Sequence, residues 1–218
     1  MTLASETELL TAYAAGETSP GLSLLCATQL SHDPRNREFV AMAEEVAGEA
    51  LRLAPVGDVT MSLDSLLTRL DEAEHAPATR SEASAPSTMT FPTVLQEAIG
   101  CAEDEIPWRF RLPGISEHVL NGFDGERVSL MRARPGARVP QHTHRGVEAT
   151  LVLAGAMKDD RRVLTKGDIA LCGSDHDHHP EIIGEETCYC LIVVDGGLRF
   201  TGALGRALNL FSDGRGRN

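Results

Sequence analysis

The first part of the chain is patterned as a series of helices. Ser5-Glu6-Thr7-Glu8 fits a capping box, in which the serine and the last glutamate satisfy backbone N–H groups at a helix start. Apolar residues then recur at helical spacing, and Gly16 can end this helix. Ser19-Pro20 and Asp33-Pro34 each combine an N-cap residue with a proline in the first turn, so two more helices are predicted to begin there. The last of the three is the longest, and its apolar positions are Phe39, Val40, Ala43, Val46, Ala47, Ala50 and Leu51.

A linker is predicted between this helical part and the rest of the chain. Residues 55–57 break the long helix, and a shorter helix is predicted over residues 63–74. Residues 76–90 have almost no large apolar group, so they cannot bury enough surface to offset their ordering entropy and are predicted to be flexible. We therefore expect a helical domain of three to four helices in residues 1–75 and a second domain in residues 91–218.

Residues 91–218 change to the alternation that strands show. A short helix is predicted over residues 91–98, and apolar and polar positions then alternate in short runs separated by glycine turns. Trp108 and Phe110 share one face of such a run and are expected in the core. Many short strands favour a sandwich or small barrel, which makes the chain an α+β protein. The clearest strands are residues 127–132, 150–153, 162–164, 168–172 and 187–194.

Composition narrows the possible functions. The net charge of −12 argues against direct binding to nucleic acid. Residues 1–90 carry 14 acidic and 5 basic side chains, so the acidic excess is concentrated in the helical part and suits a basic partner. No apolar run is long enough for a membrane helix, and the N-terminus lacks a signal peptide. We therefore expect a cytoplasmic protein without a membrane partner, and a homo-oligomer stays possible.

The five cysteines are predicted to be thiols, because their number is odd and no secretory signal precedes them. Cys26 and Cys172 are expected in the core. Cys188 and Cys190 stand two apart on a predicted strand, so their side chains share one face. This spacing fits either small core residues or a redox-active pair.

Three residues with metal-ligating side chains lie close together in the sequence. His142 and His144 are two apart, so on a strand their rings face the same point. Glu148 reaches that point if the chain bends near Gly146. Two imidazole nitrogens and a carboxylate oxygen suit a divalent transition metal such as Zn, Fe, Mn or Ni.

These residues belong to a longer motif. Gly136, His142, His144, Glu148 and Gly155, separated by five, one, three and six residues, resemble the first cupin motif at every position. The resemblance implies an all-β cupin barrel, also called a double-stranded β-helix. In that family a histidine from a later motif completes the metal site.

A second motif supplies that histidine. Gly167-Asp168 resembles the turn that opens it, and the family pattern then maps the ligand to His178, with His176 and His179 as neighbouring alternatives. The resemblance thus implies one metal in the cupin domain, with the ligands His142, His144, Glu148 and His178.

The order of the parts resembles the ChrR family of anti-sigma factors over nearly the whole chain. A helical domain, an alanine-rich linker and a cupin with Cys188 and Cys190 near its end follow one another, and residues 9–16 look like that family's first helix. The resemblance implies that residues 1–75 sequester an extracytoplasmic-function sigma factor. It also implies that the metal-bound cupin, with zinc as the favoured metal, senses stress or redox change and that the two cysteines serve the response to singlet oxygen.

The chain departs from this family in its helical domain. The family's zinc-binding run His-x-x-x-Cys-x-x-Cys maps here to Gln29, Asp33 and Asn36, which do not reproduce a histidine and thiolate set. We therefore expect no zinc in this domain. Its helices would then rely on packing alone, through the long apolar face of the third helix.

Two other functions fit the same pattern. Histidines and a carboxylate around a metal with open positions are also the site of cupin dioxygenases and isomerases, so a metal-dependent enzyme acting on a small molecule is the alternative. A structural metal that only holds the barrel closed is a third hypothesis. No catalytic residue is identified.

Overall fold

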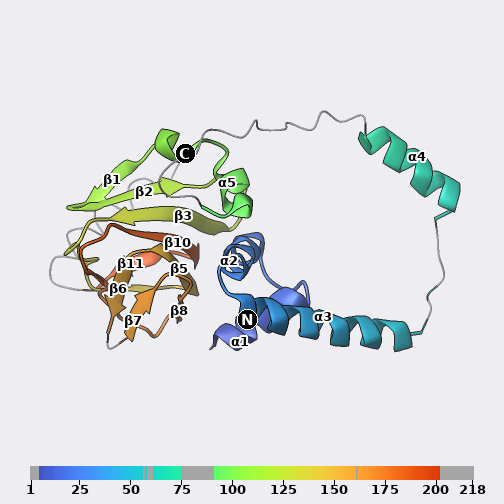
Figure 1. Cartoon of the computed structure of the whole chain (residues 1–218), viewed down its shortest axis with the longest axis horizontal. Coiled ribbons are helices and arrows are strands. Elements are labelled where there is room, and N and C mark those ends of the chain that lie inside the picture. Colours follow the sequence, from blue (N-terminus) through green and yellow to red (C-terminus); the bar gives the residue numbers. More distant parts are fainter. Residues whose placement is uncertain (1–4, 56, 58–60, 75–90, 161, 202–218) are drawn as a thin grey trace.

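The chain folds as helices followed by antiparallel strands, which confirms the predicted α+β class (Figure 1). The computed structural model describes residues 5–55, 57, 61–74, 91–160 and 162–201, so the predicted linker over residues 76–90 lies outside the described residues. The helices are α1 (Glu6–Ala14), α2 (Pro20–Leu30), α3 (Pro34–Leu53), α4 (Leu63–Glu74), α5 (Thr93–Ile99) and a 3-10 turn (Glu103–Glu105). The strands are β1 (Arg109–Leu112), β2 (Ile115–Val119), β3 (Glu126–Ala133), β4 (His142–His144), β5 (Glu148–Ala154), β6 (Ala156–Asp159), β7 (Arg162–Thr165), β8 (Ile169–Cys172), β9 (Glu181–Ile183), β10 (Cys188–Asp195) and β11 (Leu198–Phe200).

The first three helices begin at the predicted caps. Ser5 accepts a hydrogen bond from the N–H of Glu8, and Ser19 caps α2 with Pro20 in the first turn. Asp33 accepts from two backbone N–H groups at the start of α3. These contacts satisfy N–H groups that have no partner within the helix. None of the helices in the described part of the chain combines the length and apolar character that spanning a membrane requires.

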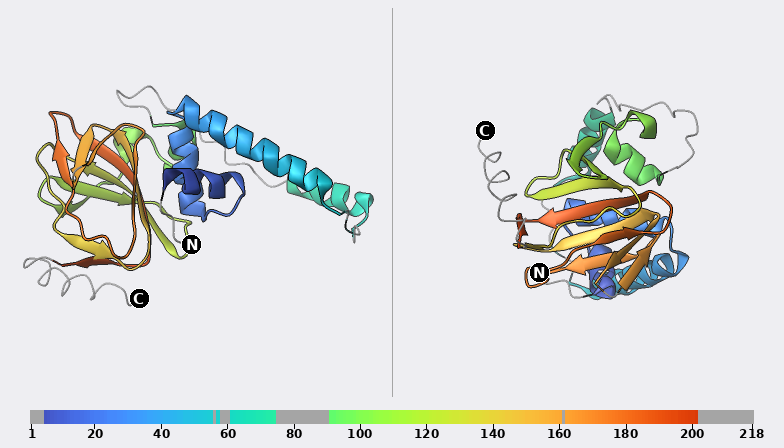
Figure 2. Two further views of the ribbon diagram at one scale, coloured as in Figure 1. Left: turned by 90° about the horizontal axis from the view of Figure 1, so that it is seen from below. Right: turned by 90° about the vertical axis from the view of Figure 1, so that its left-hand side faces the viewer.

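The strands form an antiparallel barrel. A six-stranded sheet has the order β1-β2-β3-β10-β5-β8, a three-stranded sheet has the order β7-β6-β9, and β11 pairs with β4. Figure 2 shows the sheets facing one another around a common interior. That interior is filled by one apolar cluster, to which β3, β5, β6 and β10 all contribute. The predicted small barrel is thus present.

The helical part covers the outer face of the six-stranded sheet through α2. Along β10, Leu191 and Val193 face the helices whereas Cys188 and Cys190 face the barrel interior, as the two-residue period of a strand requires. α2 packs directly on β10, β3 and β5. Strand β5 is therefore buried on both faces, which explains why its sequence reads as an almost unbroken apolar run.

A carboxylate from the barrel also caps α2. Glu126, at the start of β3, accepts hydrogen bonds from the Ser19 hydroxyl and from the N–H of Gly21 at 2.9 Å. A negative charge at a helix N-terminus complements the helix dipole as well as the unpaired N–H groups. The helical part is thus joined to the barrel by both an apolar core and a polar cap.

Two predictions about burial are wrong. Of the apolar positions of α3 only Val40 is buried, because the helix extends past α1 and α2 and beyond the sheet (Figures 1 and 2). The face that was expected to hold the helical domain together is therefore largely exposed. Phe110 is 74% exposed, and its neighbours Arg109 and Arg111 on β1 are exposed too, so both faces of this edge strand are open to solvent. Trp108 is half-buried beside Tyr189, with the Arg132 guanidinium 4.8 Å from its ring.

Candidate metal centre

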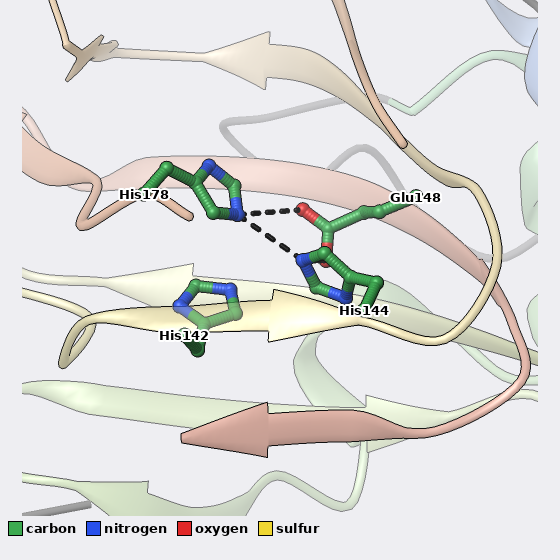
Figure 3. Close-up of side chains that lie close together, drawn as sticks. All are labelled: His142, His144, Glu148 and His178. Atoms are coloured by element: carbon green, nitrogen blue, oxygen red, sulfur yellow. Dashed lines mark hydrogen bonds and ion pairs between the residues drawn. The ribbon is translucent and has the colours of Figure 1, made fainter. Parts of the chain in front are cut away.

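The four side chains predicted as metal ligands meet inside the barrel (Figure 3). His142 and His144 come from β4, Glu148 from the start of β5, and His178 from the loop before β9. Their ligating atoms all lie within 4.8 Å of one another. The exposed fraction of each residue is between 1% and 8%, so the group is almost fully buried.

Local backbone contacts bring the four residues together. The backbones of His142 and His178 exchange two hydrogen bonds of 3.0 Å, which fixes both side chains on one side of the interior. Gly146 passes so close to the chain that a Cβ there would lie 2.3 Å from the carbonyl oxygen of Asp195. Only glycine allows this approach, and it lets Glu148 turn back toward the histidines.

Outer hydrogen bonds fix the tautomers of two imidazoles. Nδ1 of His142 lies 2.8 Å from the carbonyl oxygen of Pro140, and Nδ1 of His178 lies 2.9 Å from a carboxylate oxygen of Asp159. Both partners accept, so Nδ1 donates in each ring, and in the neutral form of each ring Nε2 carries the lone pair. Metal-ligating histidines are oriented by outer hydrogen bonds of this kind.

The inward-facing nitrogens fit a cation. Nε2 of His144 lies 3.1 Å from Nε2 of His178 and 3.3 Å from Oε2 of Glu148. Lone pairs at such separations repel unless a proton or a metal ion lies among them. The donor set of three imidazoles and one carboxylate matches what Zn and related divalent metals bind.

The pKa values of the imidazoles differ widely. Burial, together with the positive charge of His178, lowers the pKa of His142 to about 4. Burial and the positive charges of three neighbouring histidines, His142, His178 and His176, lower the pKa of His144 to about 3. Burial also disfavours the charged form of His178, but hydrogen bonds to Asp159 and Cys172 outweigh it and raise its pKa to about 10. A single proton on His178 therefore offsets the surrounding carboxylates, and a divalent cation can take over that role.

Asp159 is a part of the centre that the sequence did not reveal. It lies at the end of β6, is buried, and accepts a hydrogen bond from His178. Cys172, predicted as a core residue, is indeed buried, and its Sγ lies 3.7 Å from Nδ1 of His178. Asp159, Cys172, His176 and His178 also bring ligating atoms within 4.8 Å of one another. This second group lies on the outer side of the His178 imidazole and is not independent of the first.

Neither alternative to His178 joins the group formed with His142, His144 and Glu148. His176 and His179 are exposed, and His176 pairs with Asp160 at 3.2 Å. Of the three neighbouring histidines, His178 is the one whose side chain is buried among the other three candidate ligands.

Cys188 and Cys190 lie in the same interior. Their Sγ atoms are 3.7 Å apart on one face of β10, and Sγ of Cys190 is 3.9 Å from Sδ of Met157. Contact with Cys190 lowers the pKa of the Cys188 thiol, whereas contact with Cys188 raises that of Cys190. The pair is therefore both packed in the core and close enough for chemistry between the two sulfurs.

The residues at the positions of the family's N-terminal zinc ligands do not fit a metal. Gln29 and Asn36 turn amide N–H groups toward Glu6, and Asp33 caps α3. The groups of three or more ligating side chains found among the described residues lie in the barrel, not in these helices. The expectation that packing alone holds the helices together is wrong, because these hydrogen bonds also join them.

The barrel with its converging histidines and glutamate defines the class of protein as a cupin. The family described as the ChrR cupin-like domain matches residues 96–196. The anti-sigma-E factor ChrR of Cereibacter sphaeroides is 34% identical over 207 residues, which are 93% of this chain and 94% of the relative.

A solved structure resembles most of the chain. In the crystal structure of Rhodobacter sphaeroides SigE in complex with the anti-sigma ChrR, a chain with 29% sequence identity matches with a TM-score of 0.70, covering 88% of this chain and 97% of that chain. The chain therefore belongs to the ChrR family, and the predicted resemblance is confirmed.

Proposed function

We propose that this chain is an anti-sigma factor. Its helical part, residues 1–75, binds and sequesters an extracytoplasmic-function sigma factor, and its metal-bound cupin senses stress or redox change. Membership of the ChrR family supports this function, and the solved relative was crystallised with SigE. A sigma factor works with RNA polymerase, so the proposal places the chain in the cytoplasm.

The observation that carries the proposal is an exposed apolar surface on α3 and α4. On α3, Met42, Val46 and Leu53 are 61–76% exposed and recur at helical spacing. On α4, the four leucines at positions 63, 66, 67 and 70 are 42–70% exposed and share one face. Contiguous exposed apolar faces of this kind mark sites of protein association.

Burial of these side chains would drive binding. Each large aliphatic side chain contributes roughly 1.5–3 kcal/mol when it is fully removed from water. A helix of 12 residues such as α4 is marginal on its own, so a protein partner that covers its leucines would also stabilise it. Both helices lie away from the barrel in Figures 1 and 2, which leaves space for such a partner.

Charge supports a basic partner. Residues 1–90 hold most of the negative charge, and a sigma factor must present basic surface to DNA. An acidic protein that covers such a surface would compete with promoter DNA.

For the metal we propose zinc, held by His142, His144, Glu148 and His178. Zinc binds imidazole and carboxylate without redox chemistry, whereas iron, manganese and nickel are the alternatives for the same donors. A bound divalent cation would supply charge compensation and hold β4, β5 and the loop of His178 together. The signal would then act on the stability of this junction.

One strand connects the metal centre with the helices. Glu148 and Thr150 face the barrel interior, whereas the alternating residues Ala149 and Leu151 pack in the cluster that includes α2. A displacement of β5 at the metal centre would therefore also move Ala149 and Leu151 and change their packing against α2. This arrangement supports a sensing role for the cupin.

An enzyme remains the second candidate. The ligands are 1–8% exposed, so a small-molecule substrate would need the rim of the barrel to open before it reached the metal. This burial favours a sensor over a dioxygenase or isomerase, whose metal needs open positions for substrate. Turnover of small diketones or sugars by the metal-loaded protein would favour the enzyme.

The proposal is tested by co-expression with each extracytoplasmic-function sigma factor of the organism that encodes this chain. We expect one of them to co-purify with the chain and a promoter reporter of that sigma factor to be repressed. Leu66→Glu with Leu67→Glu on α4 should release the sigma factor. The matched control is Phe110→Glu with Val163→Glu, which places the same two charges on exposed apolar positions of β1 and β7 and should leave binding unchanged. Equal binding by both variants would refute the proposed surface.

A further inference from the structure

A polar cluster joins the first three helices at one oxygen atom. Oε1 of Glu6 in α1 accepts a hydrogen bond from the amide of Gln29 in α2 at 2.9 Å and another from the amide of Asn36 in α3 at 2.8 Å. Gln29 is buried, so water has little access to its side-chain amide. We call these three residues the Glu6 cluster.

Asp33 completes the arrangement from the start of α3. One carboxylate oxygen accepts from the N–H of Arg35 at 2.8 Å and from the N–H of Asn36 at 3.4 Å. This cap fixes the first turn of α3 and with it the position from which Asn36 reaches Glu6. Hydrogen bonds to an ionised carboxylate are shorter and stronger than neutral ones.

The polarity of the cluster is opposite to that of a metal site. A cation needs lone pairs directed at a common point. Here two N–H groups are directed at that point, and a carboxylate oxygen already occupies it. Turning either amide over would place its oxygen against the Glu6 carboxylate, so the hydrogen bonds themselves fix the amide orientations.

We infer that the Glu6 cluster takes the place of a metal ion and clamps α1 onto α2 and α3. Gln29 and Asn36 occupy two of the positions at which the family pattern has zinc ligands, and Asp33 occupies the third. The same amide of Gln29 lies 3.5 Å from the carbonyl oxygen of Gly167, in the turn between β7 and β8. The clamp therefore also touches the barrel, and this helical part holds its shape without a metal.

Metal counting in the full chain tests the inference first. His142→Ala with His144→Ala removes two ligands of the cupin centre, and we expect this double variant to carry no metal by mass spectrometry of the digested protein. A full equivalent that remains, and that is lost on adding Asn36→Ala, would place a metal in the helices and overturn the inference.

Hydrogen exchange tests the clamp itself. Glu6→Ala should speed amide exchange in α1 and at the start of α3 by about tenfold or more, since hydrogen bonds to a charged group are lost. Glu6→Gln, which keeps an acceptor oxygen, should lie between wild type and alanine. The matched control is Glu45→Ala, an exposed carboxylate of α3, which should exchange as wild type does. If Glu6→Ala does not fold, Asn36→Ala removes a single donor, and wild-type exchange in that variant would refute the clamp.

Restoring the family's zinc ligands in the helices should restore zinc binding there, which gives a third test. Gln29→His, Asp33→Cys and Asn36→Cys, introduced together into the double variant without cupin metal, should bind about one zinc ion per chain, because four-coordinate sites form from such ligands with a carboxylate. The remaining ligand would be Glu6. If no zinc is taken up, the three positions do not converge on a space of metal size, and the replacement of a metal by the cluster is wrong.

Discussion

Asp159 and His178 are joined by a buried hydrogen bond of 2.9 Å between a carboxylate oxygen and Nδ1. Because the carboxylate can only accept, His178 keeps a proton on Nδ1, and loss of its other proton leaves the lone pair of Nε2 directed toward His144 and Glu148. Asp159 therefore orients His178 without being one of the four candidate ligands itself. It lies on β6, whereas the candidate ligands come from β4, β5 and the loop before β9.

Asp159→Asn should weaken metal binding by about 10- to 100-fold, the usual cost of losing an outer hydrogen bond to a ligand. Competition against a chromophoric chelator measures this affinity. Asp160→Asn is the matched control, because Asp160 is exposed and its backbone has a φ of 48°, which asparagine tolerates. Equal affinities for the two variants would show that the Asp159 contact does not orient His178.

Metal binding should release about one proton per ion near pH 7.5. In the metal-free protein the pKa of His178 is raised to about 10, so this ring is protonated and must lose its proton to bind. The pKa values of His142 and His144 are lowered to about 4 and 3, so these rings are already neutral. Calorimetry in buffers of different ionisation enthalpy counts the protons.

The raised pKa of His178 also determines how metal affinity and stability change with pH. Metal affinity should rise with pH and level off above about pH 10, where His178 is neutral without metal. The stability that protonated His178 adds to the metal-free protein is present below its unfolded pKa and is lost as pH rises through about 10. An affinity that falls between pH 7 and 9 would contradict this assignment.

The two glycines that bound the first cupin motif should differ in their tolerance of alanine. Both have a positive φ, 75° at Gly136 and 72° at Gly155. A Cβ at Gly136 meets nothing within 4 Å, so Gly136→Ala should lower the free energy of unfolding by only about 1–2 kcal/mol. A Cβ at Gly155 lies 2.8 Å from the Cα of Cys188, so Gly155→Ala should cost about 1–3 kcal/mol more. Urea denaturation of the metal-free proteins compares them.

Glu126→Ala should destabilise the attachment of α2 to the barrel. The substitution removes the acceptor for Ser19 and Gly21, and loss of a helix cap costs about 0.5–2 kcal/mol. Exchange of the first amides of α2 should rise accordingly, and Glu126→Gln should recover part of the loss. Glu185→Ala, an exposed carboxylate in the turn before β10, serves as the control. If Glu126→Ala changes neither stability nor exchange, the apolar core is the main attachment of α2 to the barrel.

Periodicity and spacing were sufficient to predict much of the molecule. The two-residue period that placed His142 and His144 on one face is a property of any strand, and the helix caps at Ser5, Ser19 and Asp33 depend on residues within one turn. The position of His178 came from a motif, since no local rule connects it with β4. Helix caps and strand faces can be predicted from the sequence because the residues that form them are close together in it.

The remaining features depend on contacts between distant residues. The apolar period of α3 is real, but periodicity does not tell whether the partner of an apolar face lies in the same chain. Asp159 and His178 are 19 residues apart in the sequence, and an isolated acid in a strand carries no spacing signal. The packing of α2 on β10 could not be predicted for the same reason. The apolar sequence of β10 shows that the strand is buried but not which element covers it.

The apolar core shared by α2 and the six-stranded sheet limits how the chain can be divided. A cut within residues 76–90 leaves Val128, Leu130, Leu191 and Val193 without the helices that cover them. An excised barrel would therefore be prone to aggregate, and an excised helical segment would lose both its sheet support and the cap from Glu126. A different cupin could be grafted onto these helices only if it presented the same outer face.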